Sequence, residues 1–190
     1  MATEAKPFLT PEDYLRIERA AEYKSEYYQG EMFAMAGTTV AHSRIVMNVS
    51  AELVTALKGK SCQAFDSNLR VHVPATGLYT YPDVSAVCEK PQLLDKEADT
   101  LLNPILIVEV LSKSTQSYDR GDKFKNYRSI PSLREYLLIE QDQILVEQWF
   151  IKDGHWTLAE YNTLDAAITL VSLDIRLALA DVYRDIEFRA

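Results

Sequence analysis

Long hydrophobic runs are missing from this sequence of 190 residues. No stretch approaches the roughly 18 or more apolar residues that a membrane-spanning helix needs. The N-terminus, MATEAKPFLTPEDY, also lacks the basic and then apolar order of a secretory signal. We therefore expect a cytoplasmic protein with no membrane partner.

Cysteine is scarce, with Cys62 and Cys88 as the two examples. They lie far apart in strand-like surroundings, and neither has a CxxC or histidine companion at the spacing of a zinc site. The sequence therefore predicts two buried free thiols rather than a disulfide or a zinc site.

Positive charge is in short supply, because 20 Lys and Arg residues face 28 Asp and Glu residues, which gives a formal net charge of -8 at pH 7. Indiscriminate nucleic-acid binding comes mostly from neutralising phosphates, so this balance argues against a tight coat around nucleic acid. A locally basic groove remains compatible with it. Carboxylates clustered in a cleft would also suit a metal site, since a cation offsets their repulsion.

The composition itself is that of an ordinary globular protein, with 47% hydrophobic and 25% charged residues. The sequence contains no repeat, linker or low-complexity segment, and this predicts a single domain over residues 1–190. At the N-terminus, Thr10-Pro11-Glu12-Asp13 is typical of a helix start, and a hairpin should follow over residues 25–36. The remaining pattern predicts a helix at 40–58, strands at 69–73, 78–88 and 105–112, a helix at 118–129, and strands at 133–140, 144–152 and 155–161.

This order of elements, α, β, β, β, α, β over a core of about residues 40–151, indicates an α+β fold in which helices flank a mixed central sheet. The pattern of residues 168–186 is compatible with both strand and helix.

A single carboxylate interrupts the most apolar strand. Glu109 lies within the run Ile105 to Leu111, which reads as a central strand covered on both faces. An uncompensated carboxylate there would cost several kcal/mol, so Glu109 should have a cation, a proton or a partner. Asp83, after Pro82 in the preceding strand, could lie beside it, and two carboxylates suffice for Mg²⁺ when waters and substrate phosphates complete the shell. The structural alternatives are a turn carboxylate at Asp83 and an arginine partner for Glu109.

Five segments resemble a known superfamily: GEMFAMAG at 30–37 with His42 after it, YPDVSAV at 81–87, IVEVLSKST at 107–115, DRGDKFKNYR at 119–128 and EYLLIE at 135–140. Together they resemble the PD-(D/E)XK nucleases and, more closely, a bacterial family of restriction-endonuclease-like domains abundant in photosynthetic bacteria. The resemblance covers most of residues 23–186 and implies a restriction-endonuclease-like core. It also implies an endonuclease that hydrolyses phosphodiester bonds, most plausibly in DNA, with Mg²⁺ as cofactor and Mn²⁺ as a possible substitute.

The resemblance implies that Asp83 and Glu109 bind the metal and that a lysine activates the attacking water. Leu111 stands where that lysine is expected, so the lysine must come from elsewhere if the site is active. Lys113 and Lys123 are the candidates, and we favour Lys123 because its helix should pack back toward the carboxyl end of the same strand. A simple helical pair with Asp119 is the structural alternative for Lys123.

Three further residues are accessory candidates: Lys113 as the other lysine, His42 at a helix start, and Glu52, which resembles in position the accessory acid on the first core helix of the superfamily. The resemblance also implies a homodimer, in which two sites address two strands.

Two other functions remain open. Leu111 and the acidic net charge favour a nucleic-acid-binding or interaction module that has lost its chemistry. A metal-dependent hydrolase of a smaller phosphoester is the third possibility. The direction of Lys123 separates the first of these from an enzyme, because an ammonium within about 5 Å of the carboxylates would perturb them and one in solvent would not.

Overall fold

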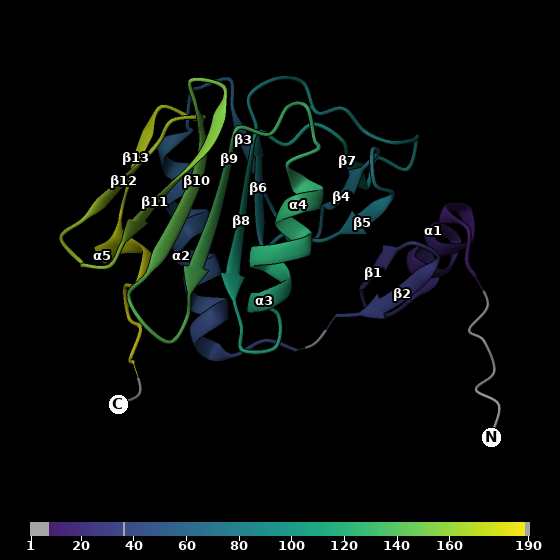
Figure 1. Cartoon of the computed structure of the whole chain (residues 1–190), viewed down its shortest axis with the longest axis horizontal. Coiled ribbons are helices and arrows are strands. Elements are labelled where there is room, and N and C mark those ends of the chain that lie inside the picture. Colours follow the sequence, from purple (N-terminus) through teal and green to yellow (C-terminus); the bar gives the residue numbers. More distant parts are fainter. Residues whose placement is uncertain (1–7, 36, 189–190) are drawn as a thin grey trace.

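The computed structural model describes residues 8–35 and 37–188 and is built around a six-stranded sheet with the order β11-β10-β9-β8-β6-β3 (Figure 1). Its strands are β3 (Gln63–Asp66), β6 (Val84–Val87), β8 (Leu106–Leu111), β9 (Glu135–Glu140), β10 (Val146–Lys152) and β11 (His155–Tyr161). β8 and β9 are parallel and the other neighbours are antiparallel, so the central sheet is mixed, as the sequence predicted. All six residues of β8 are buried, in agreement with a strand that is covered on both faces.

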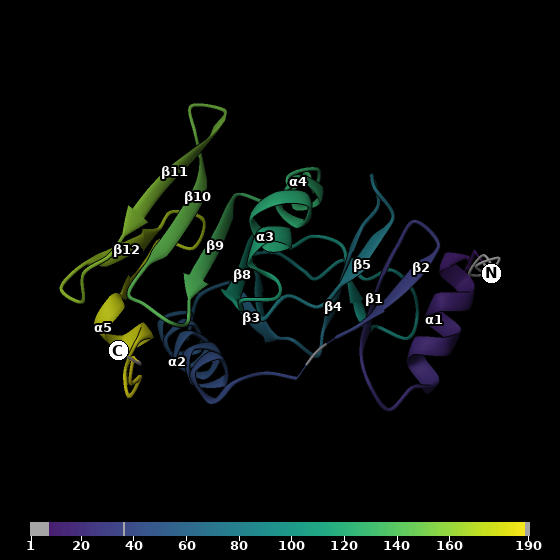
Figure 2. The same ribbon diagram turned by 60° about the horizontal axis from the view of Figure 1, so that its bottom comes forward.

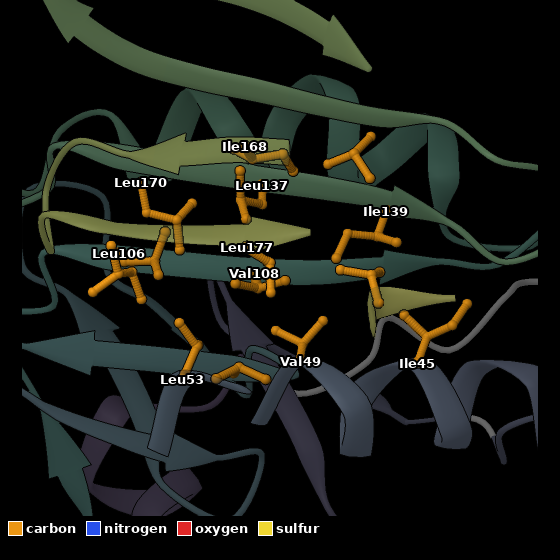
Figure 3. Close-up of a cluster of buried hydrophobic side chains, with 14 of the residues drawn as sticks. Ile45, Val49, Leu53, Leu106, Val108, Leu137, Ile139, Ile168, Leu170 and Leu177 are labelled. Atoms are coloured by element: carbon orange, nitrogen blue, oxygen red, sulfur yellow. The ribbon is translucent and has the colours of Figure 1, made fainter. Parts of the chain in front are cut away.

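Helices cover both faces of this sheet (Figure 2). On one face, α2 (Val40–Ala56) packs with the hairpin β12 (Ala167–Leu170) and β13 (Ile175–Ala178) and with α5 (Leu179–Val182). Figure 3 shows the apolar side chains of α2 against those of β8, β9 and the hairpin. The ambiguous C-terminal segment is therefore a hairpin followed by a short helix.

The opposite face carries one helical segment made of three parts, α3 (Gln116–Tyr118), a π-helical turn η1 (Asp119–Lys123) and α4 (Phe124–Tyr127). The side chains of β8 alternate between the faces, as a strand requires. Val108 and Val110 pack on the α2 side, whereas Ile107 and Leu111 pack on the α4 side.

A second sheet, with the order β2-β1-β5-β4-β7, lies beside the central one (Figures 1 and 2). Its strands are β1 (Ser25–Tyr28), β2 (Glu31–Ala34), β4 (Arg70–Val73), β5 (Leu78–Thr80) and β7 (Thr100–Leu101). The predicted N-terminal helix is α1 (Pro11–Ala20), whose first turn is capped by the Thr10 hydroxyl, and it packs on β1 and β5 through Tyr14. The predicted hairpin is β1–β2; residue 36, at its predicted end, and residues 1–7 lie outside the described residues.

Two strand predictions need correction. The predicted strand 78–88 is divided into β5 and β6, which belong to different sheets, because the chain crosses between the sheets at Tyr81-Pro82-Asp83 and proline has no N–H to donate to a ladder. The predicted strand 69–73 is β4 of the second sheet, and β3 supplies the first strand of the central sheet instead. The order α, β, β, β, α, β holds for α2, β3, β6, β8, the segment α3-η1-α4 and β9.

The prediction of free thiols is wrong, because Cys62 and Cys88 form a disulfide. β3 pairs with β6 through Gln63 and Val87; Cys62 comes directly before β3 and Cys88 directly after β6, so the antiparallel register places the two cysteines opposite each other. The sequence could not show this pairing because the two strands are 26 residues apart. Among residues 8–35 and 37–188, no helix is long and apolar enough to cross a membrane.

Candidate active site

Glu109 lies in the middle of β8 with 4% of its surface exposed, on the face covered by α3-η1-α4. Its Oε1 atom accepts a hydrogen bond of 2.8 Å from the Tyr127 hydroxyl of α4. The same oxygen lies 2.9 Å from the Lys123 ammonium. The buried carboxylate that the sequence singled out therefore has a cationic partner and a hydrogen-bond donor from one helical segment.

Asp83 lies at the point where the chain enters the central sheet. β6 pairs antiparallel with β8 through Val84 and Val108, so Asp83, one residue before Val84, extends this register to the position opposite Glu109. Its Oδ2 atom accepts a hydrogen bond of 2.7 Å from the Val110 N–H and lies 3.3 Å from Nε2 of His42. These contacts hold the Asp83 carboxylate beside Val110, the residue that follows Glu109 in β8.

Lys123 is buried in the π-helical turn, with 7% of its side chain exposed. Its ammonium contacts three carboxylates, at 2.9 Å from Glu109, 3.2 Å from Glu26 and 3.4 Å from Asp119. Lys123 thus points to Glu109 and away from solvent. The Asp119 pair that the sequence offered as an alternative is also present, but it is buried rather than solvated.

The other candidates lie elsewhere. The side chain of Lys113 is 88% exposed and lies 3.8 Å from Asp142. Glu52 is paired with Arg184 at 3.7 Å on the outer part of α2. The structure brings His42 to Asp83, but neither Lys113 nor Glu52 has a described contact with Glu109 or Asp83.

The electrostatic environment follows from burial. Burial, with a further contribution from the charges of Asp119 and Asp83, raises the pKa of Glu109 to about 8 against the opposing effect of Lys123. Burial also raises the pKa of Asp119. The pKa of Lys123 is lowered by burial, but Glu109, Tyr127, Glu26 and Asp119 together bring it well above its ordinary value. For His42, burial lowers the pKa, but the hydrogen bond and charge of Asp83 outweigh this and leave it raised.

Sequence reasoning missed two groups at this site. Tyr127 packs against Tyr136 as an ordinary core aromatic would, and its hydroxyl also donates to Glu109. Glu26 comes from the N-terminal hairpin, about 80 residues before Glu109 in the chain, and no local pattern signals its contact with Lys123. A glutamate stands out in a fully buried strand of the central sheet. In β1 every second residue is partly exposed, so a glutamate at position 26 does not stand out from the sequence pattern.

The donor set fits a hard divalent cation. The contacts described above use one oxygen of each carboxylate, Oε1 of Glu109 and Oδ2 of Asp83, and leave the second oxygen of each for an ion. Within residues 8–35 and 37–188, no three Asp, Glu, His or Cys side chains gather closely enough to hold a metal by themselves. Mg²⁺ does not require such a group, because one or two carboxylates with waters and substrate phosphates bind it.

Comparison with known proteins gives matches along most of the chain. A family model named Uma2, described as "Putative restriction endonuclease", matches residues 11–180. Two uncharacterized proteins of Synechocystis sp., slr1290 and sll1609, are 35% and 37% identical, over 96% and 88% of this chain and 95% and 96% of their own lengths. The crystal structure of a "putative nuclease belonging to DUF820" from Anabaena variabilis has the same fold, with a TM-score of 0.74 at 19% identity, over 92% of this chain and 97% of the other.

Proposed function

We propose, since this chain belongs to the Uma2 family of restriction-endonuclease-like proteins, that it hydrolyses phosphodiester bonds in DNA with the help of a divalent metal ion, Mg²⁺ in the first place and Mn²⁺ as a substitute. The observation that carries the proposal is the position of Lys123. Its buried ammonium lies 2.9 Å from Glu109, so the charge that Leu111 cannot provide reaches the site from the following helix.

Asp83 and Glu109 are the residues that would hold the ion. When bound, such an ion lowers the pKa of a water and neutralises charge that builds up on phosphorus. Lys123, fixed beside Glu109, would stabilise negative charge on the attacking or phosphoryl oxygen. The Tyr127 hydroxyl fixes the orientation of the Glu109 carboxylate, and His42 together with the Val110 N–H fixes that of Asp83.

The test compares wild type with Glu109→Gln, in which an amide replaces the charged oxygen at nearly the same volume. Cleavage of duplex, nicked and single-stranded DNA and of RNA is measured with Mg²⁺ and Mn²⁺, together with Mn²⁺ binding by calorimetry. We expect Glu109→Gln to lose at least about 100-fold in cleavage and in Mn²⁺ affinity, since even groups that only orient metal ligands contribute 10- to 100-fold. Glu160→Gln, on the exposed side of β11, is the control and should behave as wild type.

Catalysis is ruled out as the function if wild type cleaves none of these substrates under any of the metal conditions. Loss of Mn²⁺ binding in Glu109→Gln with an unchanged fold would support metal binding independently of the substrate.

A second candidate, an inactive module that binds nucleic acid or another protein, is favoured by Leu111. This side chain is 1% exposed and packs in the apolar core with Ile107 and Phe124, so the usual lysine position is part of the core. DNA binding by wild type without cleavage would support this candidate. For the third possibility, a hydrolase of smaller phosphoesters, competition by nucleotides against DNA is the discriminating measurement. A homodimer stays a prediction that sedimentation velocity would test.

A further inference from the structure

Glu26 joins the candidate site from outside the nuclease core. It lies on β1 of the second sheet, in register with Phe33 of β2, and 14% of its side chain is exposed. Its Oε1 atom lies 3.2 Å from the Lys123 ammonium and also accepts a hydrogen bond from the Thr80 hydroxyl of β5. Two strands of the second sheet thus direct one carboxylate at the lysine of the central sheet's helical segment.

The contacts around Glu26 form a closed ring. Thr80 Oγ1 also lies 3.5 Å from the Tyr127 hydroxyl, which donates to Glu109. Glu109 contacts Lys123, and Lys123 contacts Glu26. Glu26 and Glu109 are therefore connected through the ammonium, while the Thr80 and Tyr127 hydroxyls each give their proton to one of the two carboxylates and lie in contact without a hydrogen bond between them.

An ammonium has three N–H donors, and Lys123 has three carboxylate neighbours. Asp119 is four residues away on the same helical segment, and Glu109 is the proposed metal ligand. Because a lysine side chain has a flexible four-carbon stem, its direction depends on its acceptors. If a metal ion and a phosphate engage Glu109, Glu26 and Asp119 remain to hold the ammonium.

We infer that Glu26 is a positioning residue of the proposed reaction, which keeps the Lys123 ammonium directed at Glu109 and makes the N-terminal hairpin part of the active site. The inference rests on the proposed function for its catalytic meaning, whereas the contact of Glu26 with Lys123 can be tested by itself. Glu26 does not touch the reacting atoms in this assignment, and its effect passes through Lys123.

The first measurement follows Lys123 directly. The ammonium is faced by Glu26 from β1, Glu109 from β8, Asp119 from η1, Tyr127 from α4 and, at 5.8 Å, the ring of Tyr118 from α3. In Glu26→Gln the amide keeps the volume and an acceptor for Thr80 but removes one negative charge. We expect the ε-methylene signal of Lys123, assigned by its loss in Lys123→Arg, to change position in ¹H–¹³C spectra recorded at one fixed pH, since the direction of a flexible lysine stem depends on its acceptors.

Glu31→Gln is the matched control, because Glu31 is an exposed glutamate of the same hairpin. Its Lys123 signal should keep the wild-type position. The same position of the Lys123 signal in wild type and Glu26→Gln would overturn the inference. Thermal unfolding of both variants establishes that the fold is retained.

The second measurement is kinetic. With a cleaved substrate, Glu26→Gln should lower kcat at least about 10-fold with KM and Mn²⁺ affinity nearly unchanged, and Glu26→Asp, which retains the charge, should recover part of the loss. An unchanged kcat would overturn the positioning role. If wild type cleaves nothing, the proposed function fails, and the position of the Lys123 signal still decides whether Glu26 holds Lys123.

Discussion

Negative charge is in excess among the buried residues of the candidate site. Four carboxylates, those of Glu26, Asp83, Glu109 and Asp119, face the Lys123 ammonium and His42. Removing charged groups from water is costly unless they are paired, so such a site takes up protons or cations. The raised pKa values of Glu109 and Asp119 mean that these carboxylates bind protons more readily, which reduces the excess negative charge. A bound divalent ion would reduce it in the same way.

This excess predicts that the stability of the metal-free protein depends on pH. The ordinary pKa of a glutamate is 4.5 and that of folded Glu109 is about 8, so between these values the folded state binds a proton that the unfolded state has released. The contribution of Glu109 is therefore fully present below about pH 4.5 and is lost as the pH rises to 8, with a slope on the order of 1 kcal/mol per pH unit. Urea unfolding of wild type between pH 5.5 and 8.5 should show this decline.

Glu109→Gln cannot release a proton and should show a clearly smaller decline over the same range, with Glu160→Gln again as the control. His42 and Asp119, whose pKa values are also raised, contribute to the remaining slope with the same sign. Identical pH slopes in wild type and Glu109→Gln would show that folded Glu109 ionises normally.

At the residue scale, the sequence drew attention to the groups that interrupt a strong pattern. Glu109 breaks an apolar strand and Asp83 follows a strand proline, so both were predicted as site residues. Glu26 and Tyr127 interrupt nothing in their own segments, and their contacts depend on a second sheet and a helix that only the tertiary structure brings together.

Among the elements, the segment α3-η1-α4 determines where the lysine goes. Its π-helical turn brings Asp119 and Lys123 to the buried side. On another side, Arg120 pairs with Glu140 and Glu147 of β9 and β10, each at 2.7 Å, and ties the turn to the sheet. π-Helical turns within α-helices are rare and are frequent at functional sites.

The disulfide gives a second prediction. It closes a loop of 26 residues between β3 and β6, and chain-entropy arguments give a stabilisation of about 3 kcal/mol for a loop of this size. We expect the double variant Cys62→Ser with Cys88→Ser to lose on the order of 2–4 kcal/mol in the free energy of unfolding, measured by urea titration. Reducing agent should destabilise wild type and leave the double variant unchanged; equal stability of the two proteins would contradict the prediction.

Element order was predictable because each element carries its own periodicity, but sheet membership was not. The central order α, β, β, β, α, β is present, but β3 takes the place of the strand expected at 69–73. Residues 78–88 contribute one strand to each of the two sheets. Pairing of β1 with β5 and of β3 with β6 depends on partners far apart in sequence, which hydrophobic periodicity does not specify.

For the whole molecule, charge should make DNA binding depend on metal. The net charge of -8 and the carboxylates of the site repel phosphates, and local cations are needed to offset this. Fluorescence anisotropy should therefore detect DNA binding in Ca²⁺ and at least about 10-fold weaker binding in EDTA, since each coupled charge contributes on the order of 1 kcal/mol. The double variant Asp83→Asn with Glu109→Gln should depend less on Ca²⁺, and equal affinity of wild type in both conditions would contradict the prediction.

The crossing at Tyr81-Pro82-Asp83 has a consequence for cooperativity. It joins β5 of one sheet to β6 of the other, and the contact of Glu26 with Lys123 joins the same two sheets a second time. A local opening of the second sheet would therefore displace Asp83 and release Lys123 together. The apolar core on the α4 side contains residues of both sheets, among them Val71 of β4 and Ile107 of β8, so such an opening would also expose that core. The candidate active site is thus a group of side chains that exists only while both sheets are folded.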